Sequence, residues 1–337
     1  MIIPGTTKSY PEPKLDSFMT ESSYHDVVCA GILVADHVST PIDHMPASGE
    51  LILADRLALT MGGCAANVAV NLTKLGADAM VSGRVGDDLF AGVLERMIRD
   101  AGVAGTNLIA TSGIDTSQTL IVNVKGEDRR FIHTFGANSR YIAADIPIAR
   151  TKKVLYLGGY LLMGALDPLE TAELFAEAQK KGLKTVLDVV TPGPAEYLEK
   201  LKPVLPFTDV FMPNDHEAGL ITGLSSPLEQ AILFRNMGAK TVLITMGDRG
   251  TLLLGQEGHL EADTFKIEYV DGTGGGDAFA AGYIFGMIGG KSERECLILG
   301  SAVGASCVRA IGTTTGVFSG TELRDFLSKN TLTIRQH

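Results

Sequence analysis

Strand-length apolar segments alternate with amphipathic segments of helical length over most of this 337-residue chain, and this alternation limits the fold more than any other feature. The helical segments repeat apolar residues at a spacing of three and four, with a glycine close behind. Such alternation predicts an α/β domain with a mostly parallel sheet covered on both faces. The predicted strands are 27–34, 79–85, 153–157, 184–190, 209–212 and 241–246, and the clearest helices are 64–75, 89–101, 169–181 and 228–237.

Two stretches, 38–59 and 118–135, interrupt the alternation. In the second, the apolar runs LIVNV and FIHTF flank the polar run KGEDRR, a pattern typical of a β-hairpin. Ligands of open α/β sheets bind at the carboxyl edge of the strands. We therefore expect the two stretches to form a small β lid over that edge.

The chain length fits one large α/β domain with an insertion. Residues 1–24 carry several prolines without apolar periodicity, so we expect an N-terminal extension there. The main α/β domain is expected at 25–330, with lid segments inserted at about 38–60 and 115–136, and a C-terminal tail at 331–337.

Composition and charge indicate which classes of partner, and which cellular location, to expect for this chain. Against 39 acidic residues the chain has 29 lysines and arginines, and no basic block offsets the net charge of −10, so we expect no nucleic-acid partner. No apolar run reaches membrane-spanning length and no secretory leader is recognised, so we expect no membrane association and a cytoplasmic location. The four cysteines show neither a CxxC pair nor the spacing of a zinc site, so we expect them to be reduced thiols: Cys29, Cys64, Cys296 and Cys307.

The strongest local signal is the segment 271–282, DGTGGGDAFAAG, between an apolar run and a predicted helix. Gly274, Gly275 and Gly276 leave backbone N–H groups uncovered at the helix start, which predicts an anion hole. A carboxylate at Asp277 would repel that anion unless it is used, and a base that takes a proton from an attacking hydroxyl must lie there. The alternative is a glycine-rich turn whose Asp277 merely favours the helix N-terminus.

Two familiar nucleotide-binding patterns fit this segment poorly. Gly272 and Gly274 begin like a dinucleotide fingerprint, but no acidic residue closes a second strand about 20 residues later. The phosphate loop GxxxxGK[ST] is absent from the sequence. If the chain uses ATP, it holds the nucleotide in another way.

A second group of residues predicts contacts to a polyhydroxylated substrate. Gly62 and Gly63 allow close approach to the backbone, and Asn67 in the following helical turn offers both a donor and an acceptor. Asp36, which follows the first predicted strand at the carboxyl edge of the sheet, can accept hydrogen bonds from two neighbouring hydroxyls. A capped helix start explains the glycines and Asn67 equally well, and a turn aspartate that binds nearby backbone is the alternative for Asp36.

A third group predicts a place for the nucleotide and its metal. Asn214 and Glu217 share one face of a helix start, where an amide and a carboxylate can hold a hydrated magnesium ion. A capping box between the two residues is the alternative, and both interpretations can hold together. The strand-to-turn segment with Thr245, Gly247 and Gly250 carries small residues that can approach a nucleotide.

Together these motifs resemble those of the ribokinase-like (PfkB) carbohydrate kinase family. The resemblance spans about residues 26–325 and depends on Gly-Gly-x-x-x-Asn at 62–67, Gly-Arg-Val-Gly-Asp at 83–87 and Asp-x-x-Gly-x-Gly-Asp at 271–277, with an Asn-x-x-Glu between them. It implies a three-layer α/β/α domain with a mostly parallel central sheet and a small β-sheet lid. It also implies ATP-dependent transfer of a phosphoryl group to a hydroxymethyl of a sugar or sugar-like substrate.

The resemblance further implies a role for individual residues and for ATP, magnesium and potassium. It makes Asp277 the base and Gly274 to Gly276 the anion hole. It implies substrate contacts for Asp36, Gly63 and Asn67. It implies phosphate and magnesium contacts for Asn214 and Glu217 (the latter through water), and nucleotide contacts for Thr245 and Gly247. It also implies a monovalent-cation site at Asp271, Thr273, Cys307, Ala310 and Gly312.

Departures from the ribokinase pattern concern the substrate. Ribokinases resemble one another in a lysine at the position where this chain has Cys64. They also share an acidic residue near the position of Gly159 and Tyr160, which this chain lacks. In the carboxyl-terminal motif, Gly272 stands in place of threonine. These differences argue against ribose and leave fructose, a keto-deoxy sugar acid, a nucleoside or a sugar phosphate as acceptors. A non-catalytic sugar or nucleotide sensor and a nucleotide-dependent oxidoreductase are the rival functions. Exposed lid edges also predict a homodimer formed through the lid.

Overall fold

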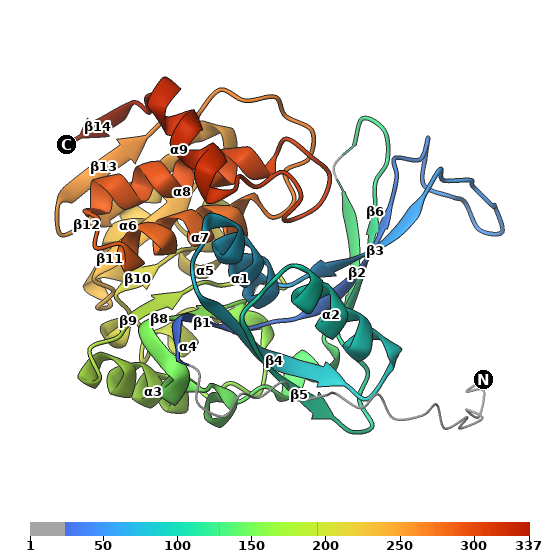
Figure 1. Cartoon of the computed structure of the whole chain (residues 1–337), viewed down its shortest axis with the longest axis horizontal. Coiled ribbons are helices and arrows are strands. Elements are labelled where there is room, and N and C mark those ends of the chain that lie inside the picture. The colour runs from blue at the N-terminus through green and yellow to red at the C-terminus, as the bar shows by residue number, and fades with distance from the viewer. Residues whose placement is uncertain (1–23, 128, 194) are drawn as a thin grey trace.

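The computed structural model describes residues 24–127, 129–193 and 195–337. An α/β body carries a projecting pair of hairpins on one side (Figure 1). The predicted N-terminal extension, 1–24, lies outside the described residues except for Tyr24.

A ten-stranded sheet forms the centre of the body in the order β14-β13-β12-β11-β10-β9-β8-β1-β4-β5. The pairs from β5 to β11 are parallel, and β12, β13 and β14 add to that sheet antiparallel. The mostly parallel sheet predicted from the sequence is therefore confirmed. Its strands are β1 His25–Gly31, β4 Ala79–Gly86, β5 Gly105–Thr111, β8 Thr151–Gly158, β9 Lys184–Leu187, β10 Val210–Phe211, β11 Thr241–Thr245, β12 Thr251–Gly255, β13 Gly258–Ala262 and β14 Ile334–Gln336.

Helices cover both faces of this sheet because the chain winds outward from β1 in two directions. One run goes through β4 to β5, and the other goes from β8 to β11; right-handed crossovers place their connecting helices on opposite faces. In front of the sheet, α7 packs on both α1 and α8 (Figure 1). The helices are α1 Cys64–Leu75, α2 Leu89–Asp100, α3 Pro168–Lys180, α4 Leu198–Leu201, α5 Asp215–Thr222, α6 Pro227–Asn236, α7 Gly275–Ile288, α8 Glu293–Cys307 and α9 Gly320–Lys329.

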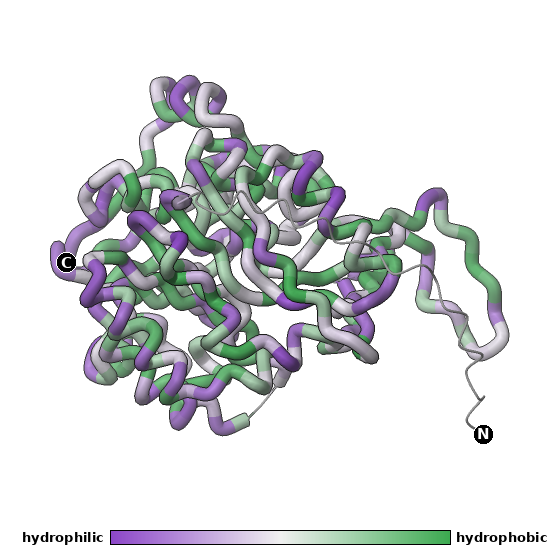
Figure 2. The backbone as a smooth tube through the Cα atoms, turned by 60° about the horizontal axis from the view of Figure 1, so that its bottom comes forward, coloured by the Kyte–Doolittle hydropathy of each residue, from purple (hydrophilic) through white to green (hydrophobic). Residues whose placement is uncertain are grey.

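A separate four-stranded sheet forms the lid, in the order β3-β2-β6-β7. The two stretches that interrupt the helix and strand alternation thus pair with each other, as predicted. The hydropathy of the backbone shows a hydrophobic stretch in the long loop between β2 and β3, where Leu51 and Leu53 are exposed (Figure 2). The lid strands are β2 Val34–Ser39, β3 Leu57–Gly62, β6 Gln118–Val122 and β7 Arg130–Thr134.

Two expectations from the sequence need correction at the ends of elements. The predicted strand 27–34 is split in two: β1 ends at Gly31, and β2 begins in the lid at Val34. Asp36 consequently lies within the lid and does not follow a strand of the main sheet. Gly31 lies so close to β8 that a Cβ there would be 2.1 Å from the Gly158 carbonyl oxygen. The predicted tail 331–337 contains β14, which pairs with β13, so the main sheet extends beyond residue 330.

The four cysteines are all buried and free, in agreement with the prediction of reduced thiols. None of the helices in the described ranges has the length and the hydrophobicity that crossing a bilayer requires. The apolar core runs continuously through the sheet and includes Tyr156, Phe175, Phe211 and Phe234, each with no exposed surface.

Close approach of α7 to α8 depends on Gly282. A Cβ there would lie 2.6 Å from the Leu299 carbonyl oxygen and 2.8 Å from Cβ of Val303. Backbone atoms of a packed helix cannot move aside as a flexible side chain does, so the two helices would separate.

We predict that Gly282→Ala lowers the free energy of unfolding by about 1–3 kcal/mol, because the added methyl overpacks the α7–α8 contact. Urea denaturation followed by circular dichroism measures the change. Gly92→Ala in α2 is the matched control: a Cβ at Gly92 meets nothing within 4 Å, so this helical substitution should be neutral or stabilise the protein by up to about 1 kcal/mol. Equal stabilisation by both variants would contradict the packing role of Gly282.

Candidate active site

Asp277 lies in the first turn of α7, directly after the three glycines. Gly274 caps this helix with φ 79, a left-handed conformation that favours glycine, and a Cβ there would lie 2.7 Å from Cα of Thr313. The Gly275 N–H donates to the Gly272 carbonyl oxygen at 3.3 Å, and the other N–H groups of a helix start have no partner within the helix, which is the feature that the anion-hole prediction requires. The positive end of α7 points at the same space as the Asp277 carboxylate.

A hydrogen bond joins Asp277 to Asn67, two residues separated by 210 positions in the sequence. Asn67 Nδ2 donates to Asp277 Oδ2 at 2.8 Å, and Thr313 Oγ1 donates to Asn67 Oδ1 at 2.8 Å. The threonine fixes the orientation of the amide, so that its NH₂ group faces the carboxylate. Burial raises the pKa of Asp277, and the hydrogen bond from Asn67 opposes this rise because it favours the charged form.

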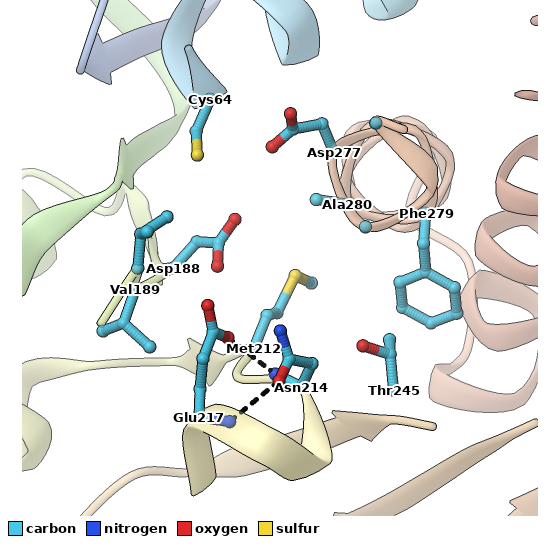
Figure 3. Close-up of a pocket in the computed structure, with 13 residues that line it drawn as sticks. Cys64, Asp188, Val189, Met212, Asn214, Glu217, Thr245, Asp277, Phe279 and Ala280 are labelled. Atoms are coloured by element: carbon cyan, nitrogen blue, oxygen red, sulfur yellow. Dashed lines mark hydrogen bonds between the residues drawn. The ribbon is translucent and has the colours of Figure 1, made fainter. Parts of the chain in front are cut away.

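Carboxylates from three elements surround a cavity of about 200 Å³ beside Asp277. Asp188 follows β9, Glu217 belongs to α5, and both point toward Asp277 and Cys64 (Figure 3). Ligand atoms of Cys64, Asp188 and Asp277 all lie within 4.8 Å of one another. Asp188 is a residue of this cavity that sequence reasoning missed; its only signal was a carboxylate in the predicted strand 184–190.

The environment of these carboxyls raises their pKa values. Burial raises the pKa of Glu217 to about 7, and it raises that of Asp188 well above its usual value, with further increases from the charges of Asp277 and Glu217. Tyr156 donates a hydrogen bond of 2.8 Å to Asp188, which opposes the shift. Among the described residues no lysine or arginine lowers the pKa of these three carboxyls.

This donor set fits magnesium. Clustered carboxylate oxygens without a counter-ion match the oxygen ligands that this ion prefers, directly or through its water. Asn214 and Glu217 also form the capping box of α5, with Asn214 Oδ1 accepting from the Glu217 backbone at 2.8 Å and Glu217 Oε2 accepting from the Asn214 backbone at 2.9 Å. The capping role is thus present, and it holds both side chains at the cavity.

A second cavity of about 750 Å³ lies on the other side of Gly276. It contains the predicted nucleotide residues Thr245, Gly247 and Gly250, and Thr245, Gly276 and Phe279 line both cavities. Aromatic and aliphatic side chains line much of it, as expected for a slot that accepts a planar base. These are Phe265, Ile267, Tyr269, Phe279, Ala305 and Val308.

The predicted substrate residues approach the active site from the lid side. Asp36 is only 8% exposed, and burial raises its pKa to about 7 although a hydrogen bond from Thr119 lowers it. A Cβ at Gly62 would lie 1.9 Å from Asp36 Oδ2, and one at Gly63, with φ 91, would lie 2.3 Å from the Ile32 carbonyl oxygen. Gly62 therefore leaves room for the Asp36 carboxylate within the lid, and Gly63 lets the start of α1 approach the backbone at Ile32. The charge of Asp277 also raises the pKa of Asp36, which indicates that the two carboxyls lie near each other.

Most of the predicted monovalent-cation residues come together at one loop. Asp271 Oδ1 accepts from the Thr273 backbone at 3.0 Å, Asp271 Oδ2 accepts from the Gly312 backbone at 3.1 Å, and Cys307 Sγ lies 3.3 Å from the Thr273 carbonyl oxygen. Ala310 belongs to the same segment, between Cys307 and Gly312. Carboxylate and carbonyl oxygens are the right donor class for a hard cation.

Arg129, from the turn between β6 and β7, brings a positive charge to this loop. Its Nη1 lies 3.4 Å from Asp271 Oδ1 and also donates to Thr273 Oγ1. The polar run KGEDRR predicted a hairpin, but nothing in the sequence indicated that Arg129 contacts Asp271 and Thr273. The lid is thereby linked to the segment that carries the anion hole.

The sequence model of the pfkB family carbohydrate kinases matches residues 24–318. The chain belongs to this family. Ribokinase from Haemophilus influenzae is 27% identical over 303 residues, which cover 88% of this chain and 96% of that protein. ATP-dependent 6-phosphofructokinase from Thermoanaerobacterium thermosaccharolyticum is 24% identical over 303 residues, 88% of this chain and 92% of that protein.

Solved structures agree on the fold. Arabidopsis thaliana ribokinase, complexed with ribose and ATP, superposes with a TM-score of 0.75 at 22% identity over 91% of this chain and 100% of that chain. A nucleoside kinase from Methanocaldococcus jannaschii gives a TM-score of 0.75 at 20% identity, covering 92% of this chain and 100% of that chain. The resemblance and the three-layer α/β/α fold with its lid, both predicted from the sequence, are confirmed. The chain is thus a carbohydrate kinase of the pfkB family, in which ATP binding is expected.

Gly276 offers a test of the nucleotide site, because a Cβ there meets nothing within 4 Å although it lies between both cavities. We predict that Gly276→Ala keeps the unfolding free energy and weakens ATP affinity about tenfold or more, since the methyl occupies space that a phosphate needs. Isothermal titration with ATP and magnesium measures the affinity. Gly92→Ala serves again as the control, and unchanged ATP affinity in Gly276→Ala would refute the close approach.

The raised pKa of Glu217 predicts a pH-dependent cost to the ligand-free protein. Its carboxyl is protonated in the folded state up to about pH 7 but ionises in the unfolded state near its ordinary value of 4.5, so stability is lost as pH rises between these values. Glu217→Gln should therefore be more stable than the parent protein at pH 8. The gain in unfolding free energy should be about 2–3 kcal/mol larger at pH 8 than at pH 5.

The control for this pH prediction is Glu229→Gln, which alters the corresponding first-turn position of α6, where the side chain is exposed. Thermal unfolding at pH 5 and pH 8 compares the two variants with the parent protein. A Glu217→Gln effect that is the same at both pH values would contradict the raised pKa.

Proposed function

We propose that this kinase transfers the γ-phosphoryl group of ATP to a hydroxymethyl of a sugar or sugar-like acceptor, with Asp277 as the general base. The observation that carries the proposal is the 2.8 Å hydrogen bond from Asn67 to Asp277 at the glycine-rich start of α7. This bond holds an oriented carboxylate between the space predicted for the acceptor and the cavity predicted for the nucleotide. A sensor protein has no need of a base at this point.

Each group of the site has a task in this proposal. Asp277 accepts the proton of the acceptor hydroxyl, and Asn67 keeps its carboxylate oriented for that step. The backbone N–H groups of Gly274 to Gly276 stabilise the charge on the transferring phosphoryl group. Asp188, Asn214 and Glu217 would hold magnesium, which supplies positive charge to the phosphates of ATP. Arg129 fastens the lid to the loop, which excludes water from the reacting groups.

The acceptor is proposed only as a class. Fructose, a keto-deoxy sugar acid, a nucleoside and a sugar phosphate remain candidates, because the relatives include ribokinases, a fructokinase-1 from Zea mays and the 6-phosphofructokinase, and one structural neighbour is a nucleoside kinase. Cys64 in place of the ribokinase lysine argues against ribose. Asp36 and Asn67 supply acceptors and a donor for two neighbouring hydroxyls, a pattern shared by all four candidates.

Potassium and a lid dimer are further parts of the proposal. Asp271 and the Thr273 carbonyl supply oxygen donors for a monovalent cation, and Arg129 already places a positive group on the same carboxylate. The lid exposes apolar side chains that a second copy would cover: Leu57 is 77% exposed, Phe131 55% and Ile132 68%. A cytoplasmic location stays a prediction.

We predict that the purified protein releases ADP from ATP and magnesium with one member of a panel of sugars, sugar acids, sugar phosphates and nucleosides. Asp277→Asn should lower the turnover about 10²–10⁴-fold, because the amide cannot accept the proton. A coupled ADP assay measures the rate, with ATP affinity measured in parallel to show that the nucleotide site is intact. Replacing potassium by tetramethylammonium in the same assay should lower the rate if the cation site at Asp271 is used.

Two outcomes would count against this proposal. Full activity of Asp277→Asn with the preferred acceptor would exclude this carboxylate as the base. Tight binding of a sugar or nucleoside without turnover anywhere in the panel would favour a non-catalytic sensor instead.

A further inference from the structure

A His, Glu, His group lies at the edge of the main sheet, on β13 and at the end of β14. The antiparallel register pairs Leu260 with Gln336, and the His337 backbone donates to the His259 carbonyl oxygen at 3.0 Å, so His259 and His337 stand opposite each other. Glu261 lies two residues beyond His259 and therefore faces the same side of the strand. Cross-strand and diagonal neighbours of this kind have side chains within mutual reach.

The three side chains converge on a common point. His259 Nε2 lies 3.3 Å from Glu261 Oε1, and His337 Nε2 lies 3.5 Å from Glu261 Oε2. The ligand atoms of all three residues lie within 4.8 Å of one another. In a tetrahedral zinc site with bonds of about 2.0–2.1 Å, adjacent ligand atoms are separated by about 3.3 Å. The two nitrogen-to-oxygen distances therefore match the edges of such a site, and both are longer than an ordinary hydrogen bond.

The imidazole of His259 lacks a hydrogen-bond partner at its buried end. Within the described residues its Nε2 atom is buried without such a partner, although its side chain as a whole is 15% exposed. Buried polar atoms without a partner are rare in native proteins and call for an explanation. His337 is 49% exposed and Glu261 is 35% exposed, so the group is closed on the side of His259 and open to solvent on the other. An ion can enter from that side and keep a water ligand.

The ion pair between Glu261 and Arg335 is long, so the Glu261 carboxylate can bind a metal ion. Arg335 lies 3.7 Å from Glu261 Oε2, but it donates a shorter bond of 2.8 Å to Asp263 Oδ1. The two imidazoles stack with centroids 4.6 Å apart, so both rings lie side by side at Glu261. Two neutral imidazoles and one carboxylate form the donor set that zinc takes in proteins.

We propose that His259, Glu261 and His337 bind a divalent transition-metal ion, with zinc as the best match, and that the ion clamps β14 to the edge of the sheet. The strand β14 has only three residues, so few backbone hydrogen bonds hold it in place. The site stands apart from Asp277 and is independent of the phosphoryl-transfer proposal. Its rival is an ion pair between a protonated histidine and Glu261.

Zinc titration of the whole protein tests the proposal. The unfolding temperature should rise by about 5 °C when free zinc exceeds the dissociation constant about 100-fold, and EDTA should reverse the rise. His337→Ala should weaken zinc binding at least about tenfold in isothermal titration, because it removes one of three ligands. This side chain lies at the surface, so the variant should fold, and Cys64, Asp188 and Asp277 near the active site remain intact in it.

The matched control is His44→Ala, because His44 forms an exposed ion pair with Glu50 in the lid, at 2.9 Å, without a second histidine. This control should retain the zinc response, and Glu261→Gln should lose it as His337→Ala does. Zinc affinity that is unchanged in both His337→Ala and Glu261→Gln would overturn the proposal. It would also be overturned if zinc did not raise the unfolding temperature of the wild-type protein, the outcome expected when the group forms only an ion pair.

Discussion

The hydrogen bond between Asn67 and Asp277 is the interaction on which the rest of the site depends. It joins the first turn of α1 to the first turn of α7, two helices that pack directly on each other. Thr313 fixes the Asn67 amide from the other side, so the carboxylate has one orientation. Asp277 lines the first cavity, and Gly276 next to it lines both cavities.

Burial of acidic groups around this bond works against the stability of the ligand-free protein. Asp188, Glu217 and Asp277 are held close together without a basic side chain that lowers their pKa values among the described residues. Such a cluster is stable only when its members are protonated or when a cation enters. The rest of the fold, with its continuous core through a ten-stranded sheet, offsets this cost. The arrangement is typical of a site in which stability is given up for binding.

The lid contributes to the site from a separate sheet. It supplies Asp36 from β2 and Arg129 from the turn before β7, and the second of these reaches the loop that precedes the anion hole. Because β2 and β7 belong to one sheet, a movement of the lid would shift Asp36 and the Arg129 contact together. Relatives of similar identity to this chain carry the names of different kinases.

The sequence by itself determined the layers, the lid and the position of the catalytic loop, because hydrophobic periodicity, hairpin turns and glycine runs act over a few neighbouring residues. It also determined the capping box of Asn214 and Glu217, which spans three positions. Only the tertiary structure decided that Asp36 belongs to the lid, that Asp188 and Arg129 join the site, that β14 extends the sheet and that His259 meets His337. These contacts join distant parts of the chain, and they arise from strand order and helix packing, which no local pattern encodes.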